Sequence, residues 1–476
     1  MAGGGELKLL GVWTSPYVIR VRVVLNLKSL PYEYVEENLG DKSALLLGSN
    51  PVHKSVPVLL HGGRPVNESQ VIVQYIDEVW PGVDGRPSVL PSDPYERAVA
   101  RFWAAYVDDK VGPAWLGIVF RSKTEEERAA AVAQAVAALE TLEEAFKECS
   151  KGKPFFGGDG IGFVDVVLGG YLGWFTGIDK LIGRRLIDPA RTPALAAWEE
   201  RFRAAEAAKG VVPDDADKVL EFRQTLLAWS ASKAKWLDSA LGMAGDDELK
   251  LLGMWTSAFV LRVRFVLNLK SLPYEFVEED LGDKSALLLA SNPVHKTVPV
   301  LLHAGRPVNE SQVILQYLDE VWPNLPPVLP SDPYERAVAR FWAAYVDDKV
   351  RLAWLGILFR SKTEEERAEA VAQADAALET LEGALRECSG GKPFFGGDSI
   401  GFVDVVLGGY LGWFTAIRKL IGRRLIDPAR TPALAAWEDR FRATEAAKGV
   451  LPDDADKMLE FRQTAIALGA SKTITL

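Results

Sequence analysis

Residues 1–22, MAGGGELKLLGVWTSPYVIRVR, return at residues 243–264 as MAGDDELKLLGMWTSAFVLRVR, and the match continues almost to the end of the chain. The offset of 242 residues falls to 239 where GVDGRPS shortens to NLPP, and a length change within a stretch rich in proline and glycine indicates a surface loop. The period exceeds the roughly 20 to 50 residues of solenoid repeats, so each copy should have its own core. Met243 therefore looks like an internal start codon, left where two similar genes were joined head to tail.

The composition, with 48% hydrophobic and 25% charged residues, is that of an ordinary globular protein. A net charge of −10 without a basic run argues against a nucleic-acid partner. The longest apolar stretch, residues 163–178, contains Asp165 and several glycines, and predicts a buried helix instead of a membrane span. No signal-peptide pattern precedes Leu7, and the two cysteines, Cys149 and Cys388, form no CxxC motif. We therefore expect a cytoplasmic protein whose partners are small molecules, without nucleic acid or membrane.

Each copy divides into two predicted domains. The first begins with strand patterns at residues 7–13 and 32–35 around a helix, continues with a strand hairpin in VPVLLHGGRPV, and ends with the helix ESQVIVQYIDEVW. This βαβ unit followed by ββα predicts a small mixed sheet with helices packed against it. After Leu90 the strand patterns stop and five helical segments follow. We place the domains at residues 6–83 and 92–232 in the first copy and at 248–324 and 331–472 in the second, with a linker at 233–247.

Three places in the α/β domain could bind a ligand, although each also has an ordinary structural explanation. Ser15-Pro16 would usually be a helix N-cap, but the hydroxyl could instead donate to an anion. Val56-Pro57 is either an edge-strand proline or a cis-proline that exposes the Val56 backbone to a peptide-like ligand. Glu68-Ser69 either caps the third helix or forms a carboxylate site at its N-terminus. The corresponding pairs of the second copy are Ser257-Ala258, Val298-Pro299 and Glu310-Ser311.

The first copy contains, in order, WTSPYVIRVR, LGDKSALLL, NPVHKSVPVL, ESQVIVQYIDEVW, LPSDPYERAVARFWAAYVDDK and FFGGDGIGFVDVVLGGYLGWF, and the second copy repeats them with few changes. Together these motifs resemble the plant tau-class glutathione transferases over essentially the whole of each copy. The resemblance implies an α/β plus all-α fold, in which a thioredoxin-like N-terminal domain binds glutathione and an all-helical C-terminal domain shapes a hydrophobic co-substrate site. It implies conjugation of the glutathione thiolate to hydrophobic electrophiles, a detoxification reaction, with glutathione peroxidase activity as a side reaction.

The resemblance also assigns roles by position. Ser15 and Ser257 correspond to the catalytic serine. Lys42 corresponds to the lysine that faces the glycyl carboxylate, the Val56 backbone to the partner of the cysteinyl part, and Glu68-Ser69 to the pair that holds the γ-glutamyl group. The expected glutathione-binding residues are Lys42, Lys54, Val56, Pro57, Glu68 and Ser69 in the first copy and Lys284, Lys296, Val298, Pro299, Glu310 and Ser311 in the second. Asp165 and Asp404 correspond to a buried capping aspartate with a role in folding.

A serine at this position predicts stabilisation of a thiolate. A free thiol has a pKa near 8.5, and only the thiolate attacks well. A hydrogen bond to a charged acceptor contributes about 1.5 to 3 kcal/mol and one pKa unit corresponds to about 1.36 kcal/mol, so the hydroxyl and the helix N-terminus should lower the thiol pKa by roughly one to two units. Relatives with cysteine here act as reductases or thiol transferases, so serine in both copies favours conjugation.

The family usually has a second lysine after NPVHK, and this chain has Ser55 or Thr297 instead. One cationic contact to the tripeptide is therefore missing. Lys54 and Lys296 could replace it only if their side chains reach inward. Because an exposed salt bridge contributes about 0 to 1 kcal/mol, we expect weaker glutathione binding and not its loss.

The two copies differ on the co-substrate side. Gly112-Pro113 becomes Arg351-Leu352, for example, so we expect diverged substrate ranges, with anionic ligands favoured near Arg351. Aromatic residues at such helical positions are more often ordinary core than ligand contacts. The expected contacts are Tyr17, Gly112, Leu116, Val119, Trp174, Phe222 and Leu226 in the first copy and Phe259, Arg351, Leu355, Leu358, Trp413, Phe461 and Ala465 in the second.

The sequence is also compatible with a protein that is not an enzyme. A non-catalytic carrier of hydrophobic ligands would keep the fold and lack turnover.

Family members pair as two-fold dimers, and because the linker can span at most about 50 Å, we favour an intrachain pseudo-dimer of the two copies over chains that exchange halves. No metal site is expected, because the four histidines lack ligand spacing. They are His53, His61, His295 and His303.

Overall fold

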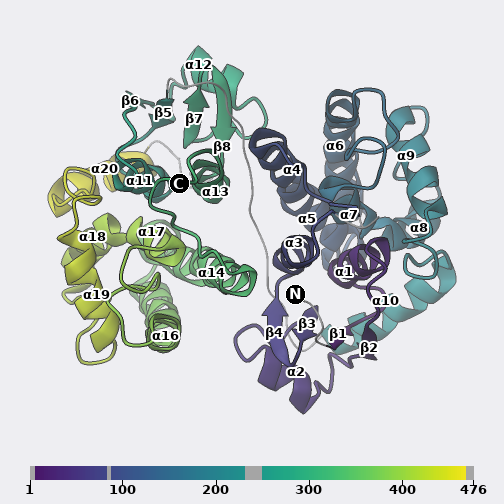
Figure 1. Ribbon diagram of the computed structural model, residues 1–476, viewed down its shortest axis with the longest axis horizontal. Helices are drawn as coiled ribbons and strands as arrows, with labels where there is room; N and C mark the ends of the chain where they lie inside the picture. The colour runs from purple at the N-terminus through teal and green to yellow at the C-terminus, as the bar shows by residue number, and fades with distance from the viewer. Residues whose placement is uncertain (1–5, 83–86, 231–248, 468–476) are drawn as a thin grey trace. The chain divides into compact units, whose positions relative to one another are not determined.

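A computed structural model describes residues 6–82, 87–230 and 249–467. The chain divides into two compact units, Met1–Ala240 and Leu241–Leu476. Both units contain the same elements in the same order (Figure 1). The predicted linker at residues 233–247 lies outside the described residues, as do residues 83–86 of the variable loop.

The α/β part of the first unit is a four-stranded sheet with the strand order β2-β1-β3-β4. β1 is parallel to β2 and antiparallel to β3, and β4 is antiparallel to β3, which confirms the predicted mixed, thioredoxin-like sheet. Leu9 and Leu10 point to opposite faces of β1, and both are fully buried because the sheet is covered on both sides. The elements are β1 (Leu7–Gly11), α1 (Pro16–Leu27), β2 (Glu33–Glu36), α2 (Ala44–Ser49), β3 (Val58–His61), β4 (Arg64–Asn67) and α3 (Ser69–Val79).

The second part of the first unit is all-helical among the described residues. Its longest helix, α6, begins at a capping box, in which Thr124 and Glu127 satisfy each other's backbone N–H groups. The elements are α4 (Pro94–Tyr106), η1 (Val107–Val111), α5 (Gly112–Leu116), η2 (Gly117–Arg121), α6 (Glu125–Ser150), α7 (Phe163–Gly169), α8 (Leu172–Ile182), α9 (Pro193–Ala204) and α10 (Ala216–Ser230).

The second unit repeats this architecture, with the strand order β6-β5-β7-β8. Its α/β elements are β5 (Leu249–Gly253), α11 (Ala258–Leu269), β6 (Glu275–Glu278), α12 (Ala286–Ser291), β7 (Val300–His303), β8 (Arg306–Asn309) and α13 (Ser311–Val321). Its helical elements are α14 (Pro333–Tyr345), η3 (Val346–Val350), α15 (Arg351–Leu355), η4 (Gly356–Arg360), α16 (Glu364–Ser389), α17 (Phe402–Gly408), α18 (Leu411–Ile421), α19 (Pro432–Arg442) and α20 (Ala455–Ala467).

Two predicted helices are more complex than their sequence patterns indicate. The helix that starts at α4 continues through two π-helical turns, η1 and η2. Pro113 does not cause them, because the second unit has Leu352 at that position and the same two turns. The apolar segment 163–178 is not one helix but two, α7 and α8, separated at Gly170 and Tyr171.

Gly170 explains why the α/β and helical parts can pack closely. A Cβ atom there would lie 2.5 Å from the Pro16 carbonyl oxygen, and at Gly409 of the second unit 2.3 Å from the Ala258 carbonyl oxygen. Only glycine permits this approach of two backbones. The first turn of α1, next to Ser15, therefore rests directly on the helical part.

Asp165 fixes the loop that precedes α7. Its carboxylate accepts hydrogen bonds from the backbone N–H groups of Phe156, Gly157 and Gly162 at 2.8–2.9 Å and from the Trp198 indole at 2.7 Å. Complete burial raises the pKa of this carboxyl to about 6, although these hydrogen bonds act in the opposite direction. Asp404 makes the same four contacts in the second unit. The predicted capping aspartate is confirmed in both units.

In the described parts of the chain, no helix is long and apolar enough to cross a membrane.

Candidate active site

The sheet register brings the predicted glutathione-binding segments to one end of the strands. Leu10 of β1 pairs with Val58 of β3, which pairs with Asn67 of β4, and Gly11 of β1 pairs with Glu36 of β2. The turn with Ser15 follows β1, the segment with Lys42 follows β2, the Val56-Pro57 bond precedes β3, and Glu68-Ser69 follows β4. All four segments therefore lie at the same end of the strands. The second unit has the same register.

Ser15 lies at the N-cap position of α1, but its side chain does not cap the helix. The residue is partly exposed, and its hydroxyl makes no hydrogen bond within the described residues. The helical part positions the turn before it, since the Trp174 indole N–H donates to the Thr14 carbonyl at 2.7 Å and the Phe222 ring packs against Trp13 at 5.8 Å. Ser15 is thus held from both sides with its hydroxyl available.

Ser257 lies in the equivalent turn, which Trp413 holds in the same way through the Thr256 carbonyl. Its hydroxyl, however, accepts a hydrogen bond from the Val260 N–H at 3.4 Å, and the residue is only 1% exposed. The helix-cap explanation therefore describes Ser257 but not Ser15.

Both Val56-Pro57 and Val298-Pro299 are cis peptide bonds, so the cis alternative is confirmed. Asn50 holds the loop before the bond, since its amide group donates to the Ser55 carbonyl at 3.0 Å and accepts from the His53 N–H at 3.1 Å. The equivalent Asn292 makes the same contacts to Thr297 and His295. The residue that replaces the family lysine is thus part of a fixed loop in both units.

The two lysines near this loop differ in their surroundings. The Lys42 ammonium donates to the Lys54 carbonyl at 2.7 Å, which ties the segment after β2 to the loop before β3. The Lys54 side chain is exposed, and its backbone has a positive φ of 53°. In the second unit, Lys284 is half-buried and Lys296 is exposed with a φ of 55°.

Glu68 is the N-cap residue of α3 and has a φ of 71°, yet its side chain makes no cap hydrogen bond. A non-glycine residue in the left-handed region is strained and marks a constrained site. Ser69 is 6% exposed, and its hydroxyl accepts a hydrogen bond from Arg20 at 3.1 Å. Glu310 and Ser311 repeat both features, with a φ of 65° and a bond from Arg262 at 3.2 Å. Capping alone therefore does not explain this pair.

Behind Ser69 lies a buried polar network that the sequence patterns did not reveal. Arg20 is fully buried in α1 and forms a bidentate ion pair with Asp108 of η1. Asp108 also accepts hydrogen bonds from Gln70 at 2.8 Å and from the Tyr171 hydroxyl at 3.0 Å. Because every partner is satisfied, the network can fix the Ser69 hydroxyl in one orientation. A sequence signal existed, namely an arginine within the apolar run of the first helix.

The second unit has the same network, built on Arg262 and Asp347. Arg351, which the first unit lacks, donates to the Asp347 backbone carbonyl at 3.0 Å. Burial acts to raise the pKa of the Asp347 carboxyl, but Arg262, with a smaller contribution from Arg351, holds it below its usual value. The predicted specificity residue Arg351 therefore lies beside the network.

The predicted co-substrate residues fall into two groups. One group is nearly fully buried, and its two tryptophans, Trp174 and Trp413, pack in aromatic clusters of the helical parts. The other group is partly exposed, and its members Phe222 and Phe461 pack against Trp13 and Trp255 next to the serine turns. The first group contains Gly112, Val119, Trp174, Leu355, Leu358, Trp413 and Ala465. The second contains Tyr17, Leu116, Phe222, Phe259, Arg351 and Phe461. The Leu226 side chain lies outside the described residues.

Burial favours the protonated thiol at both cysteines. Cys149 and Cys388 are free thiols, and burial raises the pKa of each to about 12. Across the described ranges, no group of three or more histidine, cysteine, aspartate or glutamate side chains is arranged to hold a metal ion.

Comparisons with known proteins match both parts of both units. The family model "Glutathione S-transferase, N-terminal domain" matches residues 9–83 and 251–324, and "Glutathione S-transferase, C-terminal domain" matches residues 125–201 and 364–440. The chain belongs to the glutathione S-transferase family. Each model matches twice, so the chain carries two copies in tandem, and its curated relatives place it in the tau class.

Two relatives illustrate the similarity. The "Probable glutathione S-transferase GSTU6" of Oryza sativa subsp. japonica is 91% identical over 236 residues, which are 49% of this chain and 100% of that protein. "Glutathione S-transferase U17" of Arabidopsis thaliana is 49% identical over 221 residues, 46% of this chain and 96% of that protein.

Two solved structures are also similar. The tau-class enzyme MiGSTU from mango, Mangifera indica, is 50% identical and covers 47% of this chain and 98% of its own, with a TM-score of 0.44. Rice GST1 (OsGSTU1) in complex with glutathione is 41% identical and covers 48% of this chain and 98% of its own, with a TM-score of 0.42.

Proposed function

We propose that this chain conjugates the thiolate of glutathione to hydrophobic electrophiles, with the Ser15 hydroxyl donating a hydrogen bond to the sulfur. The observation that carries the proposal is that Ser15, at the start of α1, is partly exposed and does not use its hydroxyl to cap the helix. The N-terminus of α1 adds the positive end of a helix dipole at the same point. Titration of the bound thiol by ultraviolet difference spectroscopy tests the proposal, since a pKa no lower than that of glutathione in buffer contradicts it.

Glutathione would lie in an extended form across the end of the sheet at which these segments meet. The Val56 backbone, next to the cis bond, would pair with the cysteinyl part, and Lys42 would face the glycyl carboxylate. Ser69, oriented by Arg20, would bind the γ-glutamyl carboxylate, and Glu68 the ammonium. Detoxification in the cytoplasm, with hydroperoxide reduction as a side reaction, is the physiological role that follows.

A second candidate function applies to the second unit alone. Ser257 is 1% exposed and its hydroxyl caps α11, so it is less available to a thiol than Ser15. This observation favours a second unit that binds hydrophobic ligands with little turnover, as a carrier would.

We also propose that the two units of one chain pair with each other as a pseudo-dimer. Two similar units supply the two similar faces that a two-fold contact requires. A linker of the predicted length, reaching at most about 50 Å, is compatible with such pairing.

Glutathione affinity should rise when Ser55 is replaced with lysine. The side chain at this position follows the loop held by Asn50, beside the segment with Lys42, so an ammonium there would add a cationic contact to the tripeptide. We expect Ser55→Lys to lower the Kd by up to about fivefold, because an exposed ion pair contributes about 0 to 1 kcal/mol. Calorimetric titration with glutathione measures this, and Ser55→Gln, which adds length without charge, is the control. An unchanged Kd for Ser55→Lys would show that the missing lysine does not limit binding.

Substrate range should differ between the units through Arg351. We expect Arg351→Gly, which restores the residue of the first unit, to raise KM for an electrophile with a carboxylate by several-fold while leaving KM for its methyl ester unchanged. The reason is that a half-buried cation at the start of α15 attracts an anion more strongly than the same cation would when surrounded by water. The assay compares chains that all carry Ser15→Ala, which lowers turnover by the first unit, so that the difference between Arg351 and glycine reports on the smaller activity of the second unit. Equal effects on the acid and the ester would contradict a charge-based preference.

A further inference from the structure

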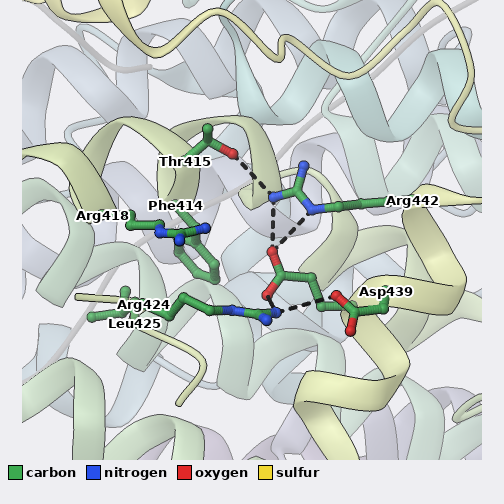
Figure 2. A pocket seen from close by; sticks show the side chains of 8 residues that line it. Phe414, Thr415, Arg418, Arg424, Leu425, Asp439 and Arg442 are labelled. Carbon is green, nitrogen blue, oxygen red and sulfur yellow. Dashed lines mark hydrogen bonds and ion pairs between the residues drawn. The ribbon is translucent and has the colours of Figure 1, made fainter. Parts of the chain in front are cut away.

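The second unit has a pocket of about 230 Å³ between α18 and α19, on the helical part. Figure 2 shows three arginines that enter it from different sides, together with two carboxylates of α19. The residues that line it are Phe414, Thr415, Arg418, Arg424, Leu425, Glu438, Asp439 and Arg442. Of the residues in the proposed glutathione and co-substrate sites, none lines this pocket.

Two of the arginines form the fixed wall of the pocket. Arg442 donates to Glu438 at 2.8 Å and to the Thr415 hydroxyl at 3.1 Å, and Arg424 donates to the other oxygen of Glu438 at 2.8 Å (Figure 2). The buried Glu438 thus holds both guanidinium groups in place. The first unit builds the same wall, with Arg185 and Arg203 on Glu199 at 2.7 and 2.9 Å.

The first unit has a carboxylate at the position equivalent to Arg418. Asp179, in α8, accepts a hydrogen bond from the Leu186 backbone N–H at 2.7 Å. Burial, together with Glu199, raises the pKa of Asp179 to about 6, while the Leu186 N–H, Arg185 and Arg203 act in the opposite direction. A carboxylate therefore occupies a point that a backbone N–H and two arginines all face.

The second unit has Arg418 where the first has Asp179. The carboxylate is gone, and among the described residues none accepts a hydrogen bond from the N–H of Leu425, which is 3% exposed. A buried N–H without a partner is rare in native structures, and Leu425 is one of the residues that line the pocket. Arg418 in turn makes no ion pair with any described residue. The pocket lining contains three arginines and two carboxylates, whereas the equivalent positions of the first unit contain two arginines and three carboxylates.

We propose that this pocket of the second unit binds a small molecule through a carboxylate or phosphate group, whose oxygens replace the Asp179 carboxylate of the first unit. The oxyanion accepts a hydrogen bond from the Leu425 N–H and pairs with Arg418 at the pocket mouth, with Arg424 and Arg442 behind it. Guanidinium groups suit this ligand because their planar donors match the oxygens of carboxylates and phosphates. The volume admits a small metabolite and excludes a peptide.

Reciprocal exchange of the two residues tests the site on the full chain. Calorimetric titrations with inorganic phosphate and with succinate, at matched ionic strength in sodium chloride, should show one site per wild-type chain that Arg418→Asp abolishes or weakens at least about tenfold, because the new carboxylate can bond the Leu425 N–H itself. The matched variant Asp179→Arg should create the same site in the first unit. Binding of phosphate alone assigns a phosphate ligand, and binding of succinate alone assigns a carboxylate.

Two results would overturn the proposal: no binding of either anion to the wild-type chain, or equal affinity in wild type and Arg418→Asp. Arg418 is exposed, so its replacement should leave folding and glutathione conjugation unchanged. If Arg418→Asp does not fold, Arg418→Leu serves in its place, since loss of the positive charge alone should weaken binding several-fold and unchanged binding rejects the site.

Discussion

Replacing both Ser15 and Ser257 with alanine is expected to lower kcat/KM for the conjugation of glutathione to a chloronitrobenzene by roughly 10- to 150-fold. A hydrogen bond from a hydroxyl to a thiolate contributes about 1.5 to 3 kcal/mol, and each 1.36 kcal/mol is a factor of about ten in rate. The pKa of the bound thiol should rise by roughly one to two units in the same variant. Steady-state kinetics and ultraviolet titration of the bound thiol measure the two effects.

The single variants separate the two units. Ser15 leaves its hydroxyl free, whereas Ser257 uses its hydroxyl to cap α11, so Ser15→Ala should account for most of the loss. Stability should show the reverse order, because removal of a serine cap costs about 0.5 to 2 kcal/mol and only Ser257→Ala removes one. Ser15→Thr, which keeps a hydroxyl, is the control for activity. A double variant that retains the wild-type kcat/KM would exclude the serine mechanism.

Asp165→Ala should unfold the first unit or leave it barely stable. The substitution leaves three backbone N–H groups and the Trp198 indole N–H without their acceptor. Each buried donor without a partner costs about 1 to 3 kcal/mol, and domains of this kind are stable by only about 5 to 15 kcal/mol. Asp165→Ala should therefore remove or shift one unfolding transition by scanning calorimetry and leave the other in place.

The duplicated chain provides its own controls for this prediction. Asp404→Ala should affect the other transition, because Asp404 makes the same four contacts in the second unit. Asp159→Ala, which removes only an exposed ion pair with Lys153, should leave both transitions within about 0.5 kcal/mol of wild type. Equal melting of Asp165→Ala and wild type would show that the carboxylate does not hold the loop.

Most of the fold could be predicted from local patterns. The segment VPVLLHGGRPV predicted the hairpin of β3 and β4, and the end of the strand patterns after Leu90 predicted the helical part that begins with α4. The π-helical turns and the division between α7 and α8 could not be predicted in this way. They depend on what packs against the helix from elsewhere in the chain, as the contact between Gly170 and the Pro16 carbonyl shows.

The candidate site was predictable where its residues begin helices or strands. The Arg20–Asp108 network was not, because its partners lie 88 residues apart and meet only when the two parts of a unit pack together. The difference between Ser15 and Ser257 was also hidden, since the residues directly adjacent to the two serines differ only in Pro16 and Ala258. The pocket of the second unit could not be predicted either, because it depends on how α18 packs against α19.

The ion pairs Arg20–Asp108 and Arg262–Asp347 each join one part of a unit to the other, and both consist of the same two residue types. A crossover between the repeats that exchanged an N-terminal half for its counterpart would therefore bring an arginine and an aspartate together again. Recombination between the two repeats of the gene would therefore preserve the ion pair between the α/β part and the helical part of each unit. The repeats could then exchange substrate-facing segments over evolutionary time while the shared framework is kept.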